Sequence, residues 1–237
     1  MKSKKIIALT GASSGIGKAT ALALSNSPHM LVLLSRNEKK LNEIAKSLDC
    51  PVLVIPADVT NIEEMEKAFE SIEEKFGGLD ILINNAGVGM FDPIDNAKLN
   101  EWHTMIDVNI KGVVNCLHFA LPLLKKSLDG QIINVASVAA HQVFPNSGVY
   151  CATKHAVGAI SKSLHLEMGK QLKITTISPG AVDTAFIDNT TNEDMIGDLK
   201  KYFAEGLTPD VIAEQIVHCI EQPSNVTISE IIIRPKR

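Results

Sequence analysis

Short apolar runs rich in β-branched residues alternate with longer, helix-patterned segments along almost the whole chain. The runs are apolar on both faces, which is typical of strands buried between two layers of helices. They predict seven strands, at residues 4–10, 30–35, 51–58, 79–85, 130–137, 172–179 and 226–235. The segments between them predict helices at residues 15–26, 38–48, 61–75, 98–126, 148–169 and 208–221. Because crossovers between parallel strands are right-handed, this order predicts an α/β fold with a doubly wound, seven-stranded parallel sheet and helices on both faces.

The length of 237 residues fits one α/β domain that spans residues 1–237, and no linker, repeat or low-complexity tract divides it. The one irregular segment, residues 183–206, is polar but carries aromatic residues such as Phe186 and Phe203. Long segments of this kind often close over a binding site, so we expect a substrate-binding lid here. A pair of surface helices is the alternative.

Charge and composition narrow the class of protein further. The net charge of −4 gives no electrostatic reason to expect nucleic acid or an anionic membrane as a partner. The first apolar run is too short for a signal peptide, and none is long enough for a transmembrane helix. The histidines lack metal-ligand spacing, so we expect no metal site. We expect a cytoplasmic protein with reduced, buried thiols at its four widely spaced cysteines, Cys50, Cys116, Cys151 and Cys219.

The first predicted strand runs directly into TGASSGIG, which places Gly11, Gly15 and Gly17 at a strand-to-helix turn. Glycines there let the backbone approach a pyrophosphate, and the start of the helix offers free N–H groups and the positive end of its dipole. The spacing is GxxxGxG rather than the usual GxGxxG. Its position after the first strand nevertheless favours a dinucleotide site over a turn without a ligand.

The end of the second predicted strand indicates which dinucleotide to expect. Enzymes that prefer NAD usually place an acid there for the ribose 2′-hydroxyl, but no Asp or Glu occurs between Gly17 and Glu38. Arg36 stands where a 2′-phosphate would lie, and a guanidinium suits a bidentate phosphate contact. We therefore expect NADP(H) rather than NAD, with an ordinary loop role for Arg36 as the alternative.

The stretch GVYCATKHAV contains Tyr150, one of two tyrosines in the chain, and Lys154 four positions later. On a helix this spacing places both side chains on one face. Lysines are common enough here that the pair, taken alone, more often marks a solvated helix face than a catalytic pair.

Three motifs in order, TGASSGIG at the start, NNAG at residues 84–87 and YCATK at residues 150–154, resemble those of the short-chain dehydrogenase/reductase family. The resemblance covers essentially the whole chain and implies a Rossmann-type fold and hydride transfer with NADP(H). It also implies a catalytic tetrad of Asn109, Ser137, Tyr150 and Lys154, in which Ser137 precedes Tyr150 by 13 positions as the family pattern requires. The cofactor-binding residues it implies are Thr10, Gly11, Ser13, Ser14, Gly15, Ile16, Gly17, Ser35, Arg36, Asp58, Val59, Asn85, Ala86, Gly87, Tyr150, Lys154, Pro179, Gly180, Val182 and Thr184.

The chemistry of carbonyl reduction needs these residue types. Hydride addition builds negative charge on the carbonyl oxygen, and Tyr150 is the candidate general acid, or the base in the reverse direction. The cationic Lys154, with an oxidised nicotinamide, predicts a lowered pKa for the phenol. Ser137 would donate a hydrogen bond to the substrate oxygen. By resemblance, Lys154 binds the nicotinamide ribose and Asn109 holds a water. Taken singly, Ser137 and Asn109 also fit ordinary structural roles.

The leading hypothesis is NADP(H)-dependent interconversion of a secondary alcohol and a ketone or aldehyde on a small substrate. The closing SEIIIRPKR resembles the branch that acts on 3-hydroxy acids and serine-like amino acids. The alternatives are a 3-oxoacyl-ACP reductase (ACP, acyl carrier protein), a sepiapterin-reductase-like or other carbonyl reductase, and a non-catalytic NADP(H)-sensing or scaffolding protein.

The family also implies a homodimer or homotetramer formed through residues 98–126 and 148–169. Residues that line the substrate pocket, or else pack as ordinary loop residues, are Met90, Phe91, His141, Gln142 and Phe144.

Overall fold

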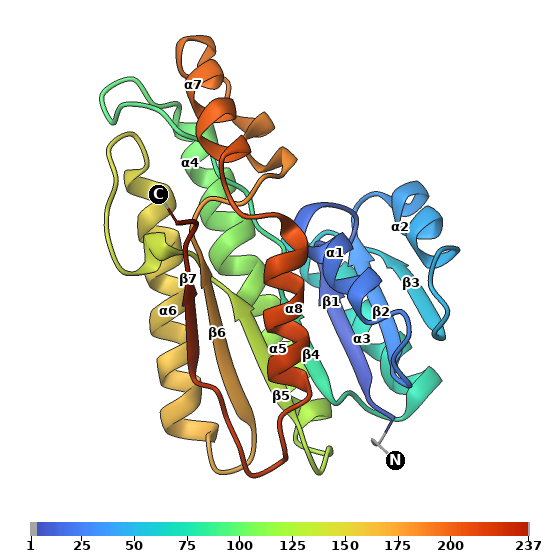
Figure 1. Cartoon of the computed structure of the whole chain (residues 1–237). Coiled ribbons are helices and arrows are strands. Elements are labelled where there is room, and N and C mark those ends of the chain that lie inside the picture. Colours follow the sequence, from blue (N-terminus) through green and yellow to red (C-terminus); the bar gives the residue numbers. More distant parts are fainter. Residues whose placement is uncertain (1–3, 237) are drawn as a thin grey trace.

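The computed structural model describes residues 4–236 and forms one parallel sheet with helices on both faces (Figure 1). Its strands are β1 (Ile6–Thr10), β2 (Met30–Ser35), β3 (Val52–Pro56), β4 (Ile81–Asn84), β5 (Gln131–Val135), β6 (Lys173–Pro179) and β7 (Glu230–Ile233). They lie in the order β3-β2-β1-β4-β5-β6-β7, and every neighbouring pair is parallel. The predicted seven-stranded Rossmann-type sheet is therefore confirmed. The chain changes direction across the sheet between β1 and β4, and such switch points are where doubly wound sheets bind ligands.

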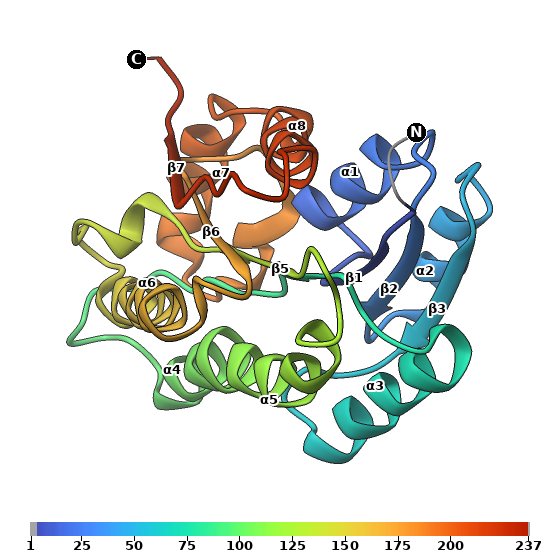
Figure 2. The ribbon, with the colours of Figure 1, turned by 90° about the horizontal axis from the view of Figure 1, so that it is seen from below.

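The helices form two layers, one on each face of the sheet (Figure 2). One layer contains α1 (Gly15–Ala23), α2 (Glu38–Ala45) and α8 (Pro209–Ile220). The other contains α3 (Ile62–Phe76), α4 (Leu99–Ile106), α5 (Gly112–Leu124) and α6 (Gly148–Met168). The irregular segment 183–206 forms a short 3₁₀ helix, η3 (Ala185–Asn189), and α7 (Glu193–Ala204).

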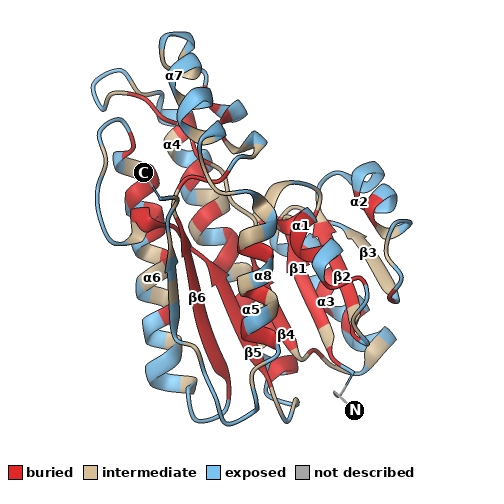
Figure 3. Ribbon diagram, viewed as in Figure 1, coloured by how far each residue is buried: buried red, intermediate tan, exposed pale blue. Residues whose placement is uncertain are grey.

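Both faces of the five central strands are buried, which explains why these strands lack polar alternation, whereas the edge strands β3 and β7 are partly exposed (Figure 3). In β1, Ile7 and Leu9 pack in the core beneath α1 and α8, which includes Ile216. Ala8, between them, faces the opposite core, which includes Phe69 of α3. Alternate residues of one strand therefore enter different cores, and each must be apolar.

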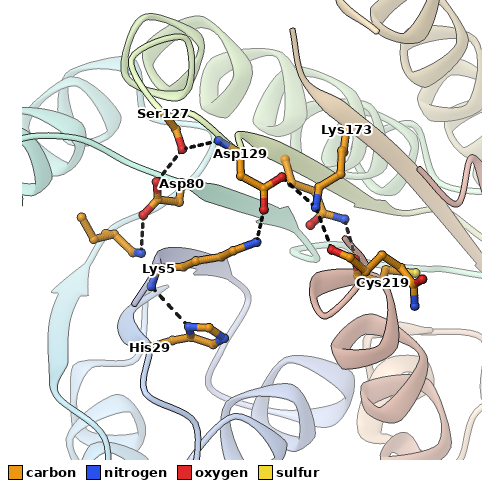
Figure 4. A network of polar contacts seen from close by, with 10 residues as sticks. Lys5, His29, Asp80, Ser127, Asp129, Lys173 and Cys219 are labelled. Carbon is orange, nitrogen blue, oxygen red and sulfur yellow. Dashed lines mark hydrogen bonds and ion pairs between the residues drawn. The ribbon is translucent and has the colours of Figure 1, made fainter. Parts of the chain in front are cut away.

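A partly buried polar network joins several strands at their amino ends, away from the cleft-forming carboxyl ends (Figure 4). Asp129 is paired with two lysines: its Oδ2 accepts a hydrogen bond from Nζ of Lys5 at 2.5 Å, and its Oδ1 forms an ion pair with Nζ of Lys173 at 2.9 Å. Asp80 accepts hydrogen bonds from the backbone N–H of Ile6 and the hydroxyl of Ser127. Burial alone would raise the pKa of Asp129, but hydrogen bonds from the two lysines hold it below its usual value. The network therefore ties β1, β4, β5 and β6 together.

All four cysteines are buried with free thiols, as the sequence predicted. Burial raises the pKa of Cys116 to about 12 and that of Cys219 to about 11, so neither thiol ionises near neutral pH. Across residues 4–236, no helix combines the length and the apolar character needed to cross a bilayer.

Candidate active site

A cleft of about 330 Å³ opens where the carboxyl ends of β1 and β4 meet. The loops after these strands, together with those after β2, β3, β5 and β6, form its walls. The predicted site residues that line it are Gly11, Ser13, Ser14, Gly15, Ile16, Ser35, Arg36, Asp58, Val59, Asn85, Ala86, Gly87, Ser137, Tyr150, Lys154, Pro179, Val182 and Thr184.

Four predicted site residues, Thr10, Gly17, Asn109 and Gly180, do not line the cleft but shape the loops that do. The Thr10 hydroxyl accepts the backbone N–H groups of Asn85 and Ala86, each at 3.0 Å. It thereby fastens the loop after β4 to the end of β1. Gly180 donates its N–H to Ile233 of β7 at 2.7 Å.

The sequence did not predict ten further lining residues: Asn37, Ala57, Val88, Val108, Val135, Ala136, Ala185, Phe186, Asn189 and Phe203. Phe186 and Phe203 had a visible signal, because they are the aromatic residues of the otherwise polar segment 183–206. Most of the others neighbour predicted site residues in sequence.

The glycine-rich turn brings the backbone close to the cleft floor. Gly11 has φ +64°, and a Cβ atom there would lie 2.9 Å from Cα of Ala86. A Cβ atom at Gly17 would lie 2.2 Å from the carbonyl oxygen of Gly11. A side chain at Gly11 would therefore push the turn away from the loop after β4, and one at Gly17 would push the start of α1 away from the turn.

The start of α1 keeps its N–H groups free for a ligand. Its N-cap residue, Ser14, makes no side-chain cap, and its first turn contains no acid. By contrast α3, which also begins near the carboxyl edge of the sheet, is capped by Asn61 and carries Glu63 and Glu64 in its first turn. The uncapped N–H groups and the positive dipole end of α1 thus suit an anionic group in the cleft.

Arg36 lies at the β2–β3 end of the cleft with little to restrain its side chain. The side chain is 72% exposed, and its Nη1 lies 3.9 Å from Oδ2 of Asp58. Asp58 is itself fixed, since its Oδ1 accepts the backbone N–H and the hydroxyl of Thr60. The Arg36 donors are therefore available to a ligand at this end.

Tyr150 and Lys154 lie one turn apart on α6 at the other end of the cleft, and both are buried. The Tyr150 ring packs edge-on against Phe91 at 5.4 Å and Phe186 at 5.6 Å between centroids. Lys154 Nζ lies 5.9 Å from the centroid of the Tyr150 ring and donates to the carbonyl of Val135 at 3.1 Å.

The expected lowering of the Tyr150 pKa does not occur in the protein without cofactor. Burial raises the pKa of Tyr150 to about 12, although a hydrogen bond with Ser137 partly offsets that rise. Burial also lowers the pKa of Lys154 to about 8. The reason is that desolvation disfavours both charged forms and, for the phenol, outweighs the attraction expected from the ammonium.

Ser137 sits beside Tyr150 at the end of β5. Its hydroxyl oxygen accepts the backbone N–H of Ala139 at 3.1 Å and donates to the carbonyl of Pro179 at 3.4 Å. The second bond is at the limit of useful length, so the hydroxyl proton can turn to a better acceptor in the cleft.

Asn109 lies in a π-helical turn, η1 (Asp107–Lys111), which separates α4 from α5. The helix predicted over residues 98–126 is therefore present, with a π-turn at residues 107–111 that the sequence did not predict. The Asn109 side chain is nearly fully buried; it accepts the N–H of Val88 and donates to the Val88 carbonyl, both at 2.8 Å, and to the Thr153 hydroxyl at 3.0 Å. These bonds tie the loop after β4 to α6, and π-turns are frequent at functional sites.

Segment 183–206 lies across the carboxyl end of the sheet, where Figure 1 shows α7 above α4. The Thr191 hydroxyl donates to Oε1 of the buried Glu101 at 2.5 Å, and Asn192 donates to Oδ1 of the buried Asp92 at 2.8 Å. Segment 183–206 therefore consists of two helices, η3 and α7, that contribute residues to the cleft lining. The hydrogen bonds to Glu101 and Asp92 hold the segment in this position.

Of the residues considered for the substrate pocket, none lines this cleft. Phe91 packs behind Tyr150, while Met90 and Phe144 line a second cavity of about 410 Å³. His141 Nε2 lies 2.9 Å from Oε1 of Glu230, and Gln142 is exposed. Their role as ordinary loop residues fits the structure better.

Comparison with known proteins identifies the class to which this fold and cleft belong. The family model described as short chain dehydrogenase matches residues 5–195. The chain is 43% identical over 236 residues to an uncharacterized oxidoreductase of Staphylococcus epidermidis, and the matched region covers 98% of this chain and 97% of the relative. The chain belongs to the short-chain dehydrogenase family.

Solved structures agree over nearly the full length. The closed form of a serine dehydrogenase complexed with NADP+ superposes with a TM-score of 0.89 at 28% identity and covers 97% of this chain and 94% of that one. A 3-ketoacyl-ACP reductase from Sinorhizobium meliloti superposes with a TM-score of 0.84 at 32% identity and covers 96% of each chain. The chain is therefore an oxidoreductase of this family.

Proposed function

We propose that this protein is an NADP(H)-dependent oxidoreductase that interconverts a secondary alcohol and a ketone, or an aldehyde, with Tyr150 as general acid and base. The observation that carries the proposal is the convergence of Tyr150, Ser137 and Lys154 at one end of a cleft whose other end holds Arg36. One end of the cleft suits proton transfer to the substrate, and the other suits recognition of the 2′-phosphate of the cofactor.

The residues present fit a phosphorylated dinucleotide. The close backbone approach at Gly11 and Gly17 and the uncapped start of α1 would hold the pyrophosphate. Arg36 would bind the 2′-phosphate, and Lys154 the ribose next to the nicotinamide. When bound, the cofactor supplies or accepts the hydride at the carbon of the substrate.

The side chains divide the remaining work. In reduction, Tyr150 gives its phenolic proton to the oxygen that gains negative charge, and Ser137 donates a hydrogen bond to the same oxygen. The charge of Lys154 stabilises the phenolate that forms. Burial raises the pKa of Tyr150 to about 12 in the protein without cofactor, so the phenol holds its proton at neutral pH. Asn109 fixes the loop and helix that carry these groups.

The substrate end of the cleft admits a small carbonyl compound. A 3-hydroxy acid or serine-like substrate is one candidate, in keeping with the superposed serine dehydrogenase. A 3-oxoacyl-ACP is the second, in keeping with the superposed 3-ketoacyl-ACP reductase. Both contain an oxygen on the carbon that would exchange hydride.

We also propose that the protein acts in the cytoplasm as a homodimer or homotetramer through α4, α5 and α6. These helices expose the apolar side chains Ile106, Val114 and Leu166, whose solvent exposure favours burial against a second copy. Light scattering after size exclusion is expected to give two or four times the chain mass of 25.6 kDa. A clean monomer would contradict this part of the proposal.

The test of the proposed reaction is NADPH oxidation against a panel of ketones and aldehydes, with wild type and Tyr150→Phe compared. Loss of a general acid usually lowers the rate by about 10²–10⁴-fold, and we expect a loss of that size on every substrate that wild type reduces. Equal rates would refute the role of Tyr150. If the wild type binds NADPH but reduces nothing, the non-catalytic sensing or scaffolding alternative would be favoured.

A further inference from the structure

The catalytic tyrosine is enclosed by aromatic rings drawn from separate parts of the chain. The aromatic wall consists of Phe91 after β4, Phe186 of η3 and Phe203 of α7, together with the Tyr150 ring. Phe91 lies 6.3 Å from Phe186 and 6.1 Å from Phe203, and Phe186 lies 6.4 Å from Phe203, all between ring centroids. The whole chain has only seven Phe and two Tyr, so this concentration at one point calls for an explanation.

The backbone makes specific room for the ring nearest to Tyr150. A Cβ atom at Gly89 would lie 2.4 Å from Cε1 and 2.5 Å from Cζ of Phe186. The loop after β4 therefore has room for the Phe186 ring in this position, called here the Phe186 seat, because residue 89 is glycine. Because Phe186 and Phe203 also line the cleft, the seat fixes an aromatic surface where the substrate must enter.

Positive charge is scarce at this end of the cleft. Among the lining residues within 4–236, the only cationic side chains are Arg36 and Lys154. Arg36 lies beside Asp58 at the far end, and Lys154 donates to Val135. A substrate carboxylate would lose its water against the negatively polarised faces of aromatic rings and find no counter-ion to compensate.

Basic side chains on the neighbouring segments do not line the cleft. His141 Nε2 lies 2.9 Å from Oε1 of Glu230, and Lys98 donates to the Thr191 hydroxyl on the exposed side of segment 183–206. Lys200 and Lys201 of α7 are exposed and lie outside the cleft lining. Arg234, beside the backbone of Gly180, has an exposed side chain and does not line the cleft.

We infer that the substrate is an uncharged carbonyl compound with an aromatic or branched apolar substituent, and that Phe186 and Phe203 select it. This inference rests on the proposed hydride-transfer function and narrows it. It disfavours free 3-hydroxy acids and amino acids, whose carboxylate would face the aromatic wall, and allows neutral esters, thioesters and simple ketones.

Two matched pairs of substrates test the inference with NADPH. The first pair is 4-phenylbutan-2-one and butan-2-one; the second is ethyl 3-oxobutanoate and 3-oxobutanoate. A fitting apolar group is worth about 10–200-fold in kcat/KM, so we expect wild type to favour the phenyl ketone and the ester by about tenfold or more. A preference for 3-oxobutanoate over its ester would overturn the inference.

Substitutions in the aromatic wall test whether Phe186 and Phe203 cause the preference for the phenyl ketone. Phe186→Ala and Phe203→Ala are each expected to lower kcat/KM for the phenyl ketone by about tenfold more than for butan-2-one. The matched control is Phe76→Ala, which removes a partly buried ring at the end of α3, outside the cleft lining and the aromatic wall, and should leave that ratio unchanged. Equal losses on both ketones would contradict a role in selection.

Two further variants separate recognition from misfolding. Phe186→Leu keeps an apolar side chain, so it should retain the wild-type Kd for NADPH while losing part of the phenyl preference. Phe186→Arg places a cation in the wall and should raise the ratio of acid to ester turnover by about tenfold or more. An unchanged ratio in a variant that binds NADPH normally would refute the inference. If wild type reduces none of the four compounds, nor any of the wider panel, the proposed function itself fails.

Discussion

Replacing Lys154 by methionine should make the protein without cofactor more stable and at the same time inactive. Lys154 is 5% exposed, and burial lowers its pKa from 10.5 to about 8. At about 1.36 kcal/mol per pKa unit, the buried charge costs about 3 kcal/mol near neutral pH. Methionine has similar length, no charge, and fills irregular apolar space well.

The gain is smaller than the cost of the charge because one hydrogen bond is lost. Lys154 donates to the Val135 carbonyl, and a bond from a charged donor contributes about 1.5–3 kcal/mol. The net gain is about 1 kcal/mol, which for a chain of this size raises Tm by about 2–4 °C. The assay is thermal unfolding of wild type and Lys154→Met without cofactor, followed by circular dichroism at pH 7.

The change of the stability difference with pH tests whether the charge of Lys154 is its cause. The folded-state pKa lies below the unfolded one, so between about pH 8 and pH 10.5 the unfolded chain binds more protons than the folded one. Wild-type stability gains from this residue as the pH rises through that window, so the advantage of Lys154→Met should shrink from pH 7 to pH 10. A variant that is less stable at every pH, by a constant amount, would refute the reasoning.

Three other changes test separate parts of the structure. Arg36→Ala should lower kcat/KM for NADPH by about 10–100-fold, the loss expected for charge-assisted hydrogen bonds, and leave NADH unaffected, while the exposed Lys39→Ala should change neither. Asp129→Asn should destabilise the fold by about 3 kcal/mol in urea titrations, because two buried lysines lose their counter-ion, yet leave kcat unchanged. Asn192→Ala should raise KM for the carbonyl substrate by loosening segment 183–206, and an unchanged KM would mean that its bond to Asp92 has no such role.

The sequence predicted the sheet well because its signal is local. Apolar runs on both faces of each strand need only a few neighbouring residues to be recognised, and a helix must follow each parallel strand. The π-turn at residues 107–111, inside the predicted helix, has no such local signal, because Asn109 bonds to Val88 and Thr153, which are 21 and 44 positions away.

The chemistry of the site was harder to predict than its residues. Motif order was enough to name Tyr150 and Lys154, and the structure places both in the cleft. The rise in the Tyr150 pKa, however, comes from burial under Phe91 and Phe186, which no local pattern reveals. Burial in the folded protein raises the Tyr150 pKa, whereas the charge of the neighbouring Lys154 alone would lower it.

The most direct test combines a label on the transferred hydride with removal of the hydroxyl that would give the proton. Wild type is incubated with a ketone and NADPH that carries deuterium at both C4 positions, and mass spectrometry locates the label in the alcohol. We expect deuterium on the carbinol carbon from wild type, and its formation slowed by at least about 10²-fold in Tyr150→Phe of normal NADPH affinity. Label transfer at equal rates in the two proteins, or an alcohol formed without the label, would contradict the assignment of hydride transfer with Tyr150 as the acid.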